Sequence, residues 1–117
     1  MPATAPQALV VRLLAPAGVS DDAVETSSDL EGVGAGLSYG AMTFAIKPGR
    51  ASHPHQHASE ETWLVQSGHG YALIGTERVS LQAGSRVTVP SHTLHSVVNA
   101  QSIPLVVLGF WWRRHEG

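Results

Sequence analysis

The chain of 117 residues has the length of one ordinary domain, and its apolar content of 43% can supply a single hydrophobic core. Charged residues make up only 14%, the formal net charge is −2, and no run of Lys or Arg is present, which excludes the basic footprint of a nucleic-acid-binding protein. The absence of cysteine excludes disulfides and thiolate sites, and no apolar stretch approaches the ~20 residues of a membrane span. We expect one domain, residues 1–117, in the cytoplasm, with neither a nucleic-acid nor a membrane partner.

The N-terminal part of the chain has the least regular pattern. "ALVVRLL" (8–14) is interrupted by Arg12 and follows no basic stretch, so it predicts a strand and not a signal peptide. Residues 16–35 are rich in Gly, Ser and acids, and "SDDAVET" within them is compatible with a helical turn capped by Ser20 or Asp21. Structureless segments of this length are uncommon in compact domains, so we expect short strands or a lid here.

The chain from residue 36 onward predicts an all-β domain. Met42, Phe44 and Ile46 share one face of a long strand within residues 36–49. Shorter segments punctuated by Gly or Pro follow, at 61–68, 70–75, 78–84, 86–90, 94–99 and 104–112. No segment of ten or more residues has helical periodicity. Roughly seven to ten short strands with turn residues between them indicate a sandwich or barrel.

The stretch "ASHPHQHASEETWLVQSGHG" (51–70) gathers imidazoles beside carboxylates. His55 and His57 are two residues apart and would point to one face of an extended strand, and Glu61 begins the next strand. Two nitrogen donors and one hard oxygen converging from adjacent strands suit a divalent transition metal. A lone His-x-His pair is more often a surface feature, but a second stretch, 84–99, places His95 at the start of another apolar strand.

Together the two stretches resemble the two sequence motifs of the cupin superfamily. These motifs are G-x5-H-x-H-x3-E-x6-G and G-x5-P-x-G-x2-H-x3-N. Nine of the ten specified positions match, with 15 residues between the motifs. The matching residues are Gly49, His55, His57, Glu61, Gly68, Gly84, Pro90, His95 and Asn99. The internal Gly of the second motif is replaced by His92.

The resemblance implies a cupin-type antiparallel jelly-roll β-barrel over about residues 36–112, preceded by a strand and loop in residues 1–35. It also implies a divalent transition metal (Fe, Mn, Ni or Zn) in the mouth of the barrel, held by His55, His57, Glu61 and His95. Such a ligand set leaves two positions on an octahedral ion for substrate, water or dioxygen. Gly68 and Gly84 are expected at turns that need positive φ.

Strand alternation predicts which other side chains reach the mouth. If Glu61 points inward, so does Trp63, and we expect Trp63, Met42 and Phe44 to form the substrate pocket. The alternative for these apolar side chains is that they belong to the barrel core. Glu60, on the opposite face of the same strand, is expected to face solvent.

Three residues are candidates for catalysis: Glu61, His92 and His53. Glu61 could move a proton in addition to binding the metal, and the two imidazoles suit proton transfer near neutral pH. The alternative for His92 is a loop residue with an unusual backbone conformation, and for His53 a side chain turned outward.

A mouth lined by Trp, Phe and Met favours a small, partly apolar, oxygen-bearing substrate. We expect a metal-dependent enzyme, in the first place a dioxygenase-type oxidoreductase. The alternatives are an isomerase, cyclase or lyase that uses the ion as a Lewis acid, and a non-catalytic small-molecule-binding cupin. The low charge density and the apolar segment 8–14 predict a homodimer, because exposed edge strands tend to be covered or paired with another chain.

Overall fold

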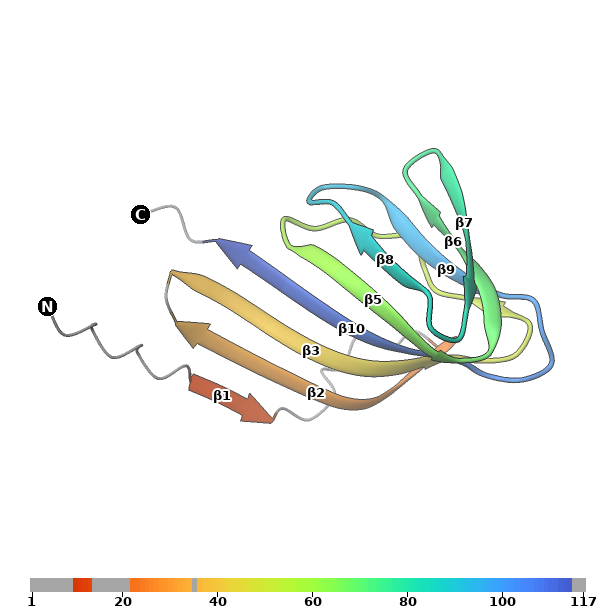
Figure 1. Ribbon diagram of the computed structural model, residues 1–117, viewed down its shortest axis with the longest axis horizontal. Helices are drawn as coiled ribbons and strands as arrows, with labels where there is room; N and C mark the ends of the chain where they lie inside the picture. The colour runs from red at the N-terminus through yellow and green to blue at the C-terminus, as the bar shows by residue number, and fades with distance from the viewer. Residues whose placement is uncertain (1–9, 14–21, 35, 115–117) are drawn as a thin grey trace, which may run out of the picture.

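The computed structural model describes residues 10–13, 22–34 and 36–114. All regular structure in these residues is β-strand, in two antiparallel sheets (Figure 1). The strands are β1 (Val10–Leu13), β2 (Val24–Gly34), β3 (Leu37–Ile46), β4 (Arg50–Ala51), β5 (Glu60–Ser67), β6 (His69–Ile74), β7 (Glu77–Gln82), β8 (Arg86–Val89), β9 (His95–Asn99) and β10 (Leu105–Arg114). The all-β jelly-roll prediction is confirmed. No helix capable of crossing a membrane occurs in the described ranges.

The two sheets differ in size and only partly cover each other. The larger has the strand order β1-β2-β3-β10-β5-β8 and the smaller the order β4-β9-β6-β7. In Figure 1 the smaller sheet stands over one end of the larger, while β2, β3 and β10 continue past it. One side of the barrel is open, where β9 begins and the long strands β2, β3 and β10 continue past the smaller sheet. We call this open side the mouth of the barrel.

The core lies between the two sheets and follows from strand alternation. Met42, Phe44 and Ile46 share the inner face of β3, as expected; Phe44 and Ile46 are buried, and Met42 is partly buried against the core. The other strands contribute Trp63, Val65, Ala72, Leu81, Val89, Val97, Leu105 and Val107 to the same cluster. Burial of these apolar side chains is the main favourable term in folding.

The segment before β3 differs from the expectation of short strands or a lid. Residues 24–34 form one long strand, which pairs with β3 from Val24 opposite Ile46 to Gly34 opposite Leu37. No helical turn forms in the described part of this segment, because the strand already begins at Val24. A long neighbouring strand satisfies the backbone groups, which outweighs a weak local helical preference. Residues 20 and 21, the proposed caps, lie outside the described ranges.

The N-terminal strand expected at residues 8–14 is present as β1, and it forms the edge of the six-stranded sheet. Residues 8, 9 and 14 lie outside the described ranges. Gly68 and Gly84 lie at turns, and both have a φ of +88°, as expected. At Gly68 a Cβ atom would lie only 2.5 Å from the carbonyl oxygen of Pro104, so that turn has no room for a side chain.

Candidate metal centre

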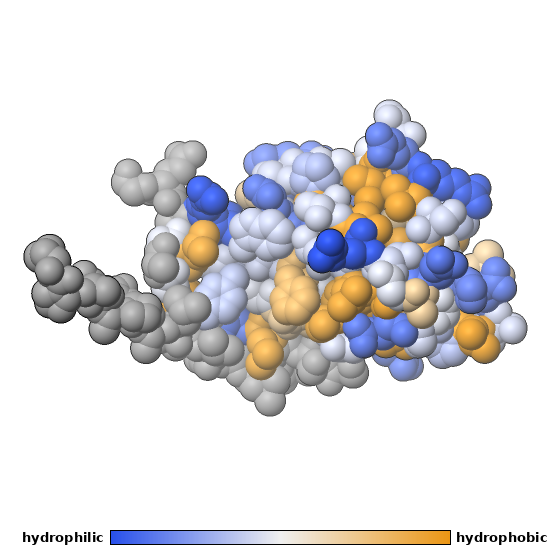
Figure 2. Space-filling model, viewed as in Figure 1, coloured by the Kyte–Doolittle hydropathy of each residue, from blue (hydrophilic) through white to orange (hydrophobic). Residues whose placement is uncertain are grey.

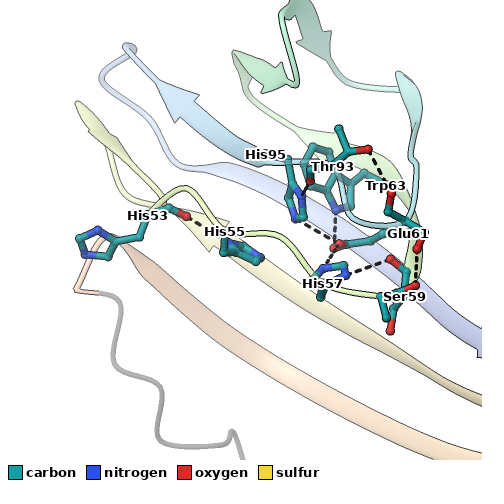
Figure 3. A network of polar contacts seen from close by, with 10 residues as sticks. His53, His55, His57, Ser59, Glu61, Trp63, Thr93 and His95 are labelled. Atoms are coloured by element: carbon teal, nitrogen blue, oxygen red, sulfur yellow. Dashed lines mark hydrogen bonds and ion pairs between the residues drawn. The ribbon is translucent and has the colours of Figure 1, made fainter.

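Two distant chain segments meet at the mouth. His55 and His95 face each other across an isolated antiparallel bridge, with N–H···O distances of 3.1 and 2.9 Å. The backbone N–H of His92 donates to the carbonyl of His57 at 2.7 Å. These bonds fix the loop between β4 and β5 against the start of β9, so the imidazoles of both segments come together (Figure 3).

Three of these imidazoles form a compact cluster. One ring nitrogen from each of His55, His57 and His95 lies within 4.8 Å of the others. The Nδ1 atom of each ring contacts a backbone carbonyl oxygen, that of His53, Ser59 and Thr93 respectively, at 3.0, 2.9 and 2.8 Å. A carbonyl can only accept, so each Nδ1 carries the proton and each Nε2 of a neutral ring keeps a lone pair. Metal-binding histidines are oriented by such second contacts.

Glu61, the second residue of β5, adds a carboxylate to the cluster. Its Oε2 lies 3.1 Å from Nε2 of His57 and 3.4 Å from Nε2 of His95. Its Oε1 accepts a hydrogen bond of 2.7 Å from the indole N–H of Trp63. Both side chains lie on the inner face of the strand, as alternation predicts, while Glu60 is exposed.

The electrostatics of Glu61 and His95 favour opposite charges. Burial alone would raise the pKa of Glu61, but the neighbouring imidazole of His95 and the indole N–H of Trp63 outweigh it and hold that pKa below its usual value of 4.5. Burial alone would lower the pKa of His95, but the carboxylate of Glu61 and the carbonyl of Thr93 outweigh it and raise that pKa above 6.5. The site therefore presents an ionised carboxylate and favours positive charge beside it.

The donor set fits a divalent transition ion. His95 is 2% exposed, and its Nε2 has no hydrogen-bond partner among the described residues. Nitrogen lone pairs and a carboxylate oxygen face one another at 3.1 and 3.4 Å, an arrangement that repels unless a cation lies among them. Three imidazoles with one carboxylate match the preference of Fe, Mn, Ni and Zn for mixed nitrogen and oxygen ligands. The cluster thus indicates a divalent metal site, with Glu61 as the predicted fourth ligand.

The two other candidate catalytic histidines lie outside the cluster. His53 is exposed, and Figure 3 shows its ring turned away from the three clustered imidazoles. His92 is exposed and has a φ of +57°, the single positive value at a non-glycine position among the described residues. His92 is thus a loop residue in an unusual conformation, at the motif position of a Gly. Proton transfer by either residue stays a prediction.

The residues expected to form the substrate pocket lie at different depths. Trp63 and Phe44 are only 2% and 8% exposed, so they present almost no surface to a ligand at the mouth. Met42 is partly exposed.

Sequence reasoning missed Trp111, which lies opposite Glu61 on β5 and opposite Gly40 on β3. Its indole covers Gly40, where an added Cβ would lie 2.4 Å from the indole nitrogen.

The strand alternation of "GFWW" could have shown that Trp111 and Trp112 point to opposite faces. It could not show which of them shares a face with Glu61, because that depends on the register between β10 and β5. This register includes an irregularity between Val106 and Val107. Three-dimensional pairing was therefore needed to identify Trp111 as a residue of the mouth.

Comparison with protein families agrees with this architecture and donor set. The family model described as "Cupin domain" matches residues 42–111, which is more than half of the chain. The matched range includes all three clustered histidines and Glu61. The chain belongs to the cupin domain family.

Solved structures resemble the chain at low sequence identity. A protein from Acidithiobacillus ferrooxidans, provisionally named as a sugar phosphate isomerase, is 29% identical, with a TM-score of 0.56 over 64% of this chain. The chain spans half the length of that protein. A cupin 2 conserved barrel domain protein from Salinispora arenicola is 23% identical, with a TM-score of 0.58, and the match covers 89% of this chain and 75% of that one. KdgF from Halomonas is also 23% identical, with a TM-score of 0.60 and coverage of 80% and 83%.

Proposed function

We propose that this cupin is a metal-dependent enzyme that acts on a small, oxygen-bearing organic molecule. The observation that carries the proposal is the convergence of three proton-free imidazole nitrogens and one carboxylate oxygen at the mouth of the barrel. Three neutral imidazoles and one carboxylate leave a divalent site with a net charge of about +1, which attracts an oxyanion.

The protein residues around the ion have distinct tasks. An ion held by His55, His57, Glu61 and His95 would supply Lewis acidity and, if it is iron, reactivity toward dioxygen. The Nδ1 contacts fix the imidazole rings, and Trp63 fixes one oxygen of Glu61, so the ligands are oriented before the ion binds. With Oε1 held by Trp63, Oε2 is the oxygen available for an ion or a proton.

The substrate is proposed to lie against Met42 and Trp111. Both are on the inner face of the larger sheet, and Trp111 is next to Glu61 in the register of β10 and β5. The flat indole over Gly40 offers an apolar surface for a carbonyl, enolate or carboxylate compound bound at the metal. Phe44 and Trp63 then support this wall from the core.

The first candidate reaction is an oxidative cleavage that consumes dioxygen. The apolar wall suits an organic chelate without phosphate, because a phosphate group would need a nearby Lys or Arg. Two cationic side chains that could have served this purpose do not face the mouth. Lys47 lies 3.9 Å from Glu25, and Arg86 lies opposite Leu64 on the outer face of the larger sheet. These positions support a partly apolar substrate.

The second candidate is Lewis-acid isomerase or lyase chemistry. Its support is the 29% identity to the protein provisionally named as a sugar phosphate isomerase. In this reaction His92 or His53 could move a proton at the rim, since an imidazole has one nitrogen that donates a proton and one that accepts it.

Metal analysis tests the site itself. Elemental analysis of the purified protein is expected to find one divalent transition ion per chain, and His57→Ala and His95→Ala are expected to lose most of it. A His53→Ala variant is the matched control, because His53 lies outside the cluster. Equal metal content in the wild type and both cluster variants would refute the assignment.

Oxygen dependence separates the two reactions. Candidate substrates are screened with Fe(II)-loaded and Zn(II)-loaded protein, with and without air. Turnover that needs both Fe(II) and oxygen supports the dioxygenase. Turnover that persists with zinc under anaerobic conditions supports the isomerase or lyase, and metal binding without any turnover supports the non-catalytic cupin.

A further inference from the structure

A cavity lies at the rim of the barrel, outside the metal cluster. Its volume is about 380 Å³, and none of the four metal-site residues lines it. The end of β10 contributes Trp112, Arg113 and Arg114, the start of β5 contributes Glu60, and the loop before β9 contributes His92. These residues are far apart in the sequence, and only the pairing of β5 with β10 and the contact between the two mouth loops bring them together.

The loop side of this rim cavity is held by hydrogen bonds. The hydroxyl of Ser91 donates to the carbonyl of Ala58 at 2.7 Å, and both residues line the cavity. The backbone N–H of His92 donates to the carbonyl of His57 at 2.7 Å. The two loops are thus joined at two points, and the cavity exists without a ligand.

The charges in the rim cavity do not neutralise one another. Arg113 and Arg114 are exposed, and neither forms an ion pair within the described residues. Glu60, on the same wall, also forms none there. Two arginines and one glutamate give the lining a net charge of about +1. That charge matches a monoanion better than a dianion.

His92 keeps its place in this cavity at a conformational cost. Its φ of +57° is in the left-handed region, where a residue with a Cβ is less stable than Gly. The motif has Gly at this position, so the backbone conformation itself does not require the imidazole. Residues held in such conformations often serve a site, and here the side chain forms part of the cavity wall.

We infer that the rim cavity binds a small organic monoanion, namely a carboxylate attached to a flat, apolar group. Guanidinium groups recognise carboxylates through paired, charge-assisted hydrogen bonds, and Arg113 and Arg114 supply them. The half-buried indole of Trp112 provides a surface on which the flat group stacks. His92 is also part of the lining. The site does not depend on a metal ion, and it shares only His92 with the second candidate reaction.

The probe for this site is benzoate, with benzyl alcohol as the uncharged analogue. The full-length chain has three tryptophans, and Trp112→Phe identifies the indole N–H signal of Trp112 in a ¹⁵N NMR spectrum. Benzoate is expected to shift this signal saturably, with a dissociation constant below about 1 mM. Benzyl alcohol is expected to bind at least about tenfold more weakly, because it lacks the charge. Equal binding of the two compounds, or no saturable shift up to about 10 mM benzoate, overturns the inference.

Substitutions of the lining residues are expected to change the affinity for benzoate in opposite directions. The double change Arg113→Gln and Arg114→Gln is expected to weaken benzoate binding about tenfold, and His92→Gly is expected to weaken it while leaving the chain folded. Glu60→Gln is expected to strengthen binding, because it removes a repelling carboxylate. Arg86→Gln removes an exposed arginine away from the cavity and is the matched control, expected to change nothing.

A metal-site variant separates this inference from the proposed function. His57→Ala is expected to keep benzoate binding at Trp112 even when it loses the metal. Loss of binding in His57→Ala, or an equal effect of Arg86→Gln and the double arginine change, would show that benzoate does not bind in the rim cavity as proposed.

Discussion

The indole N–H of Trp63 donates to Oε1 of Glu61 at 2.7 Å, and the other oxygen of that carboxylate faces His57 and His95. Trp63 is 2% exposed, so this hydrogen bond is shielded from water and links the hydrophobic core directly to the cluster. A core residue thereby decides which carboxylate oxygen is available for an ion. Such indirect support of a metal ligand is common in metalloproteins.

Removal of this hydrogen bond should weaken metal binding. In Trp63→Phe the carboxylate of Glu61 loses the indole donor at Oε1, so its oxygens are less well fixed. We expect metal affinity to fall about 10- to 100-fold, measured by competition with a chelator below the melting temperature. Trp111→Phe is the control, because its indole lies over Gly40. Unchanged affinity in Trp63→Phe would contradict the positioning role.

Metal affinity should fall on acidification, beginning above the pH expected for an ordinary histidine. Histidine ligands bind as neutral imidazoles, so protons compete with the ion. Burial opposes protonation of His95, but Glu61 and the Thr93 carbonyl outweigh it and raise the pKa of His95 above 6.5. Its protonated fraction therefore grows already above that pH. Affinity is measured by chelator competition from about pH 5 to 8, and a flat profile would argue against histidine ligation.

At position 92 a Gly variant should be more stable than an Ala variant, which is the reverse of the usual order. Ala normally stabilises a chain relative to Gly by restricting the unfolded state, but at a φ of +57° its Cβ is unfavourable in the folded state. We expect His92→Gly to be more stable than His92→Ala by about 1 kcal/mol. Denaturant unfolding of both variants measures the difference. A more stable Ala variant would mean that the loop relaxes to another conformation.

A homodimer is expected in solution. β1 lies at the edge of the six-stranded sheet with one side unpaired among the described strands. Phe110 and Leu30 are 44% and 39% exposed, and Figure 2 shows apolar side chains at the surface. Light scattering should give about twice the chain mass of 12.3 kDa. A particle of single-chain mass at micromolar concentration would refute the dimer, and a dimer that persists in Phe110→Glu would point to the β1 edge.

The sequence by itself determined the all-β class and most strand positions, and the resemblance of its two motifs to the cupin superfamily pointed to the residues of the candidate metal site. These features are local: alternation places Glu61 and Trp63 on one face, and the spacing of each motif lies within one or two strands. The long β2 was not predicted, because its stability comes from pairing with β3 and not from its own composition.

Tertiary structure alone decided which distant residues meet. The bridge between His55 and His95 brings the two motifs together, and the register of β10 against β5 places Trp111, and not Trp112, beside Glu61. The rim cavity likewise combines Glu60, His92 and Arg114 from separate segments. A shift of one residue in strand register would move every side chain to the opposite face, and neither strand encodes its register alone.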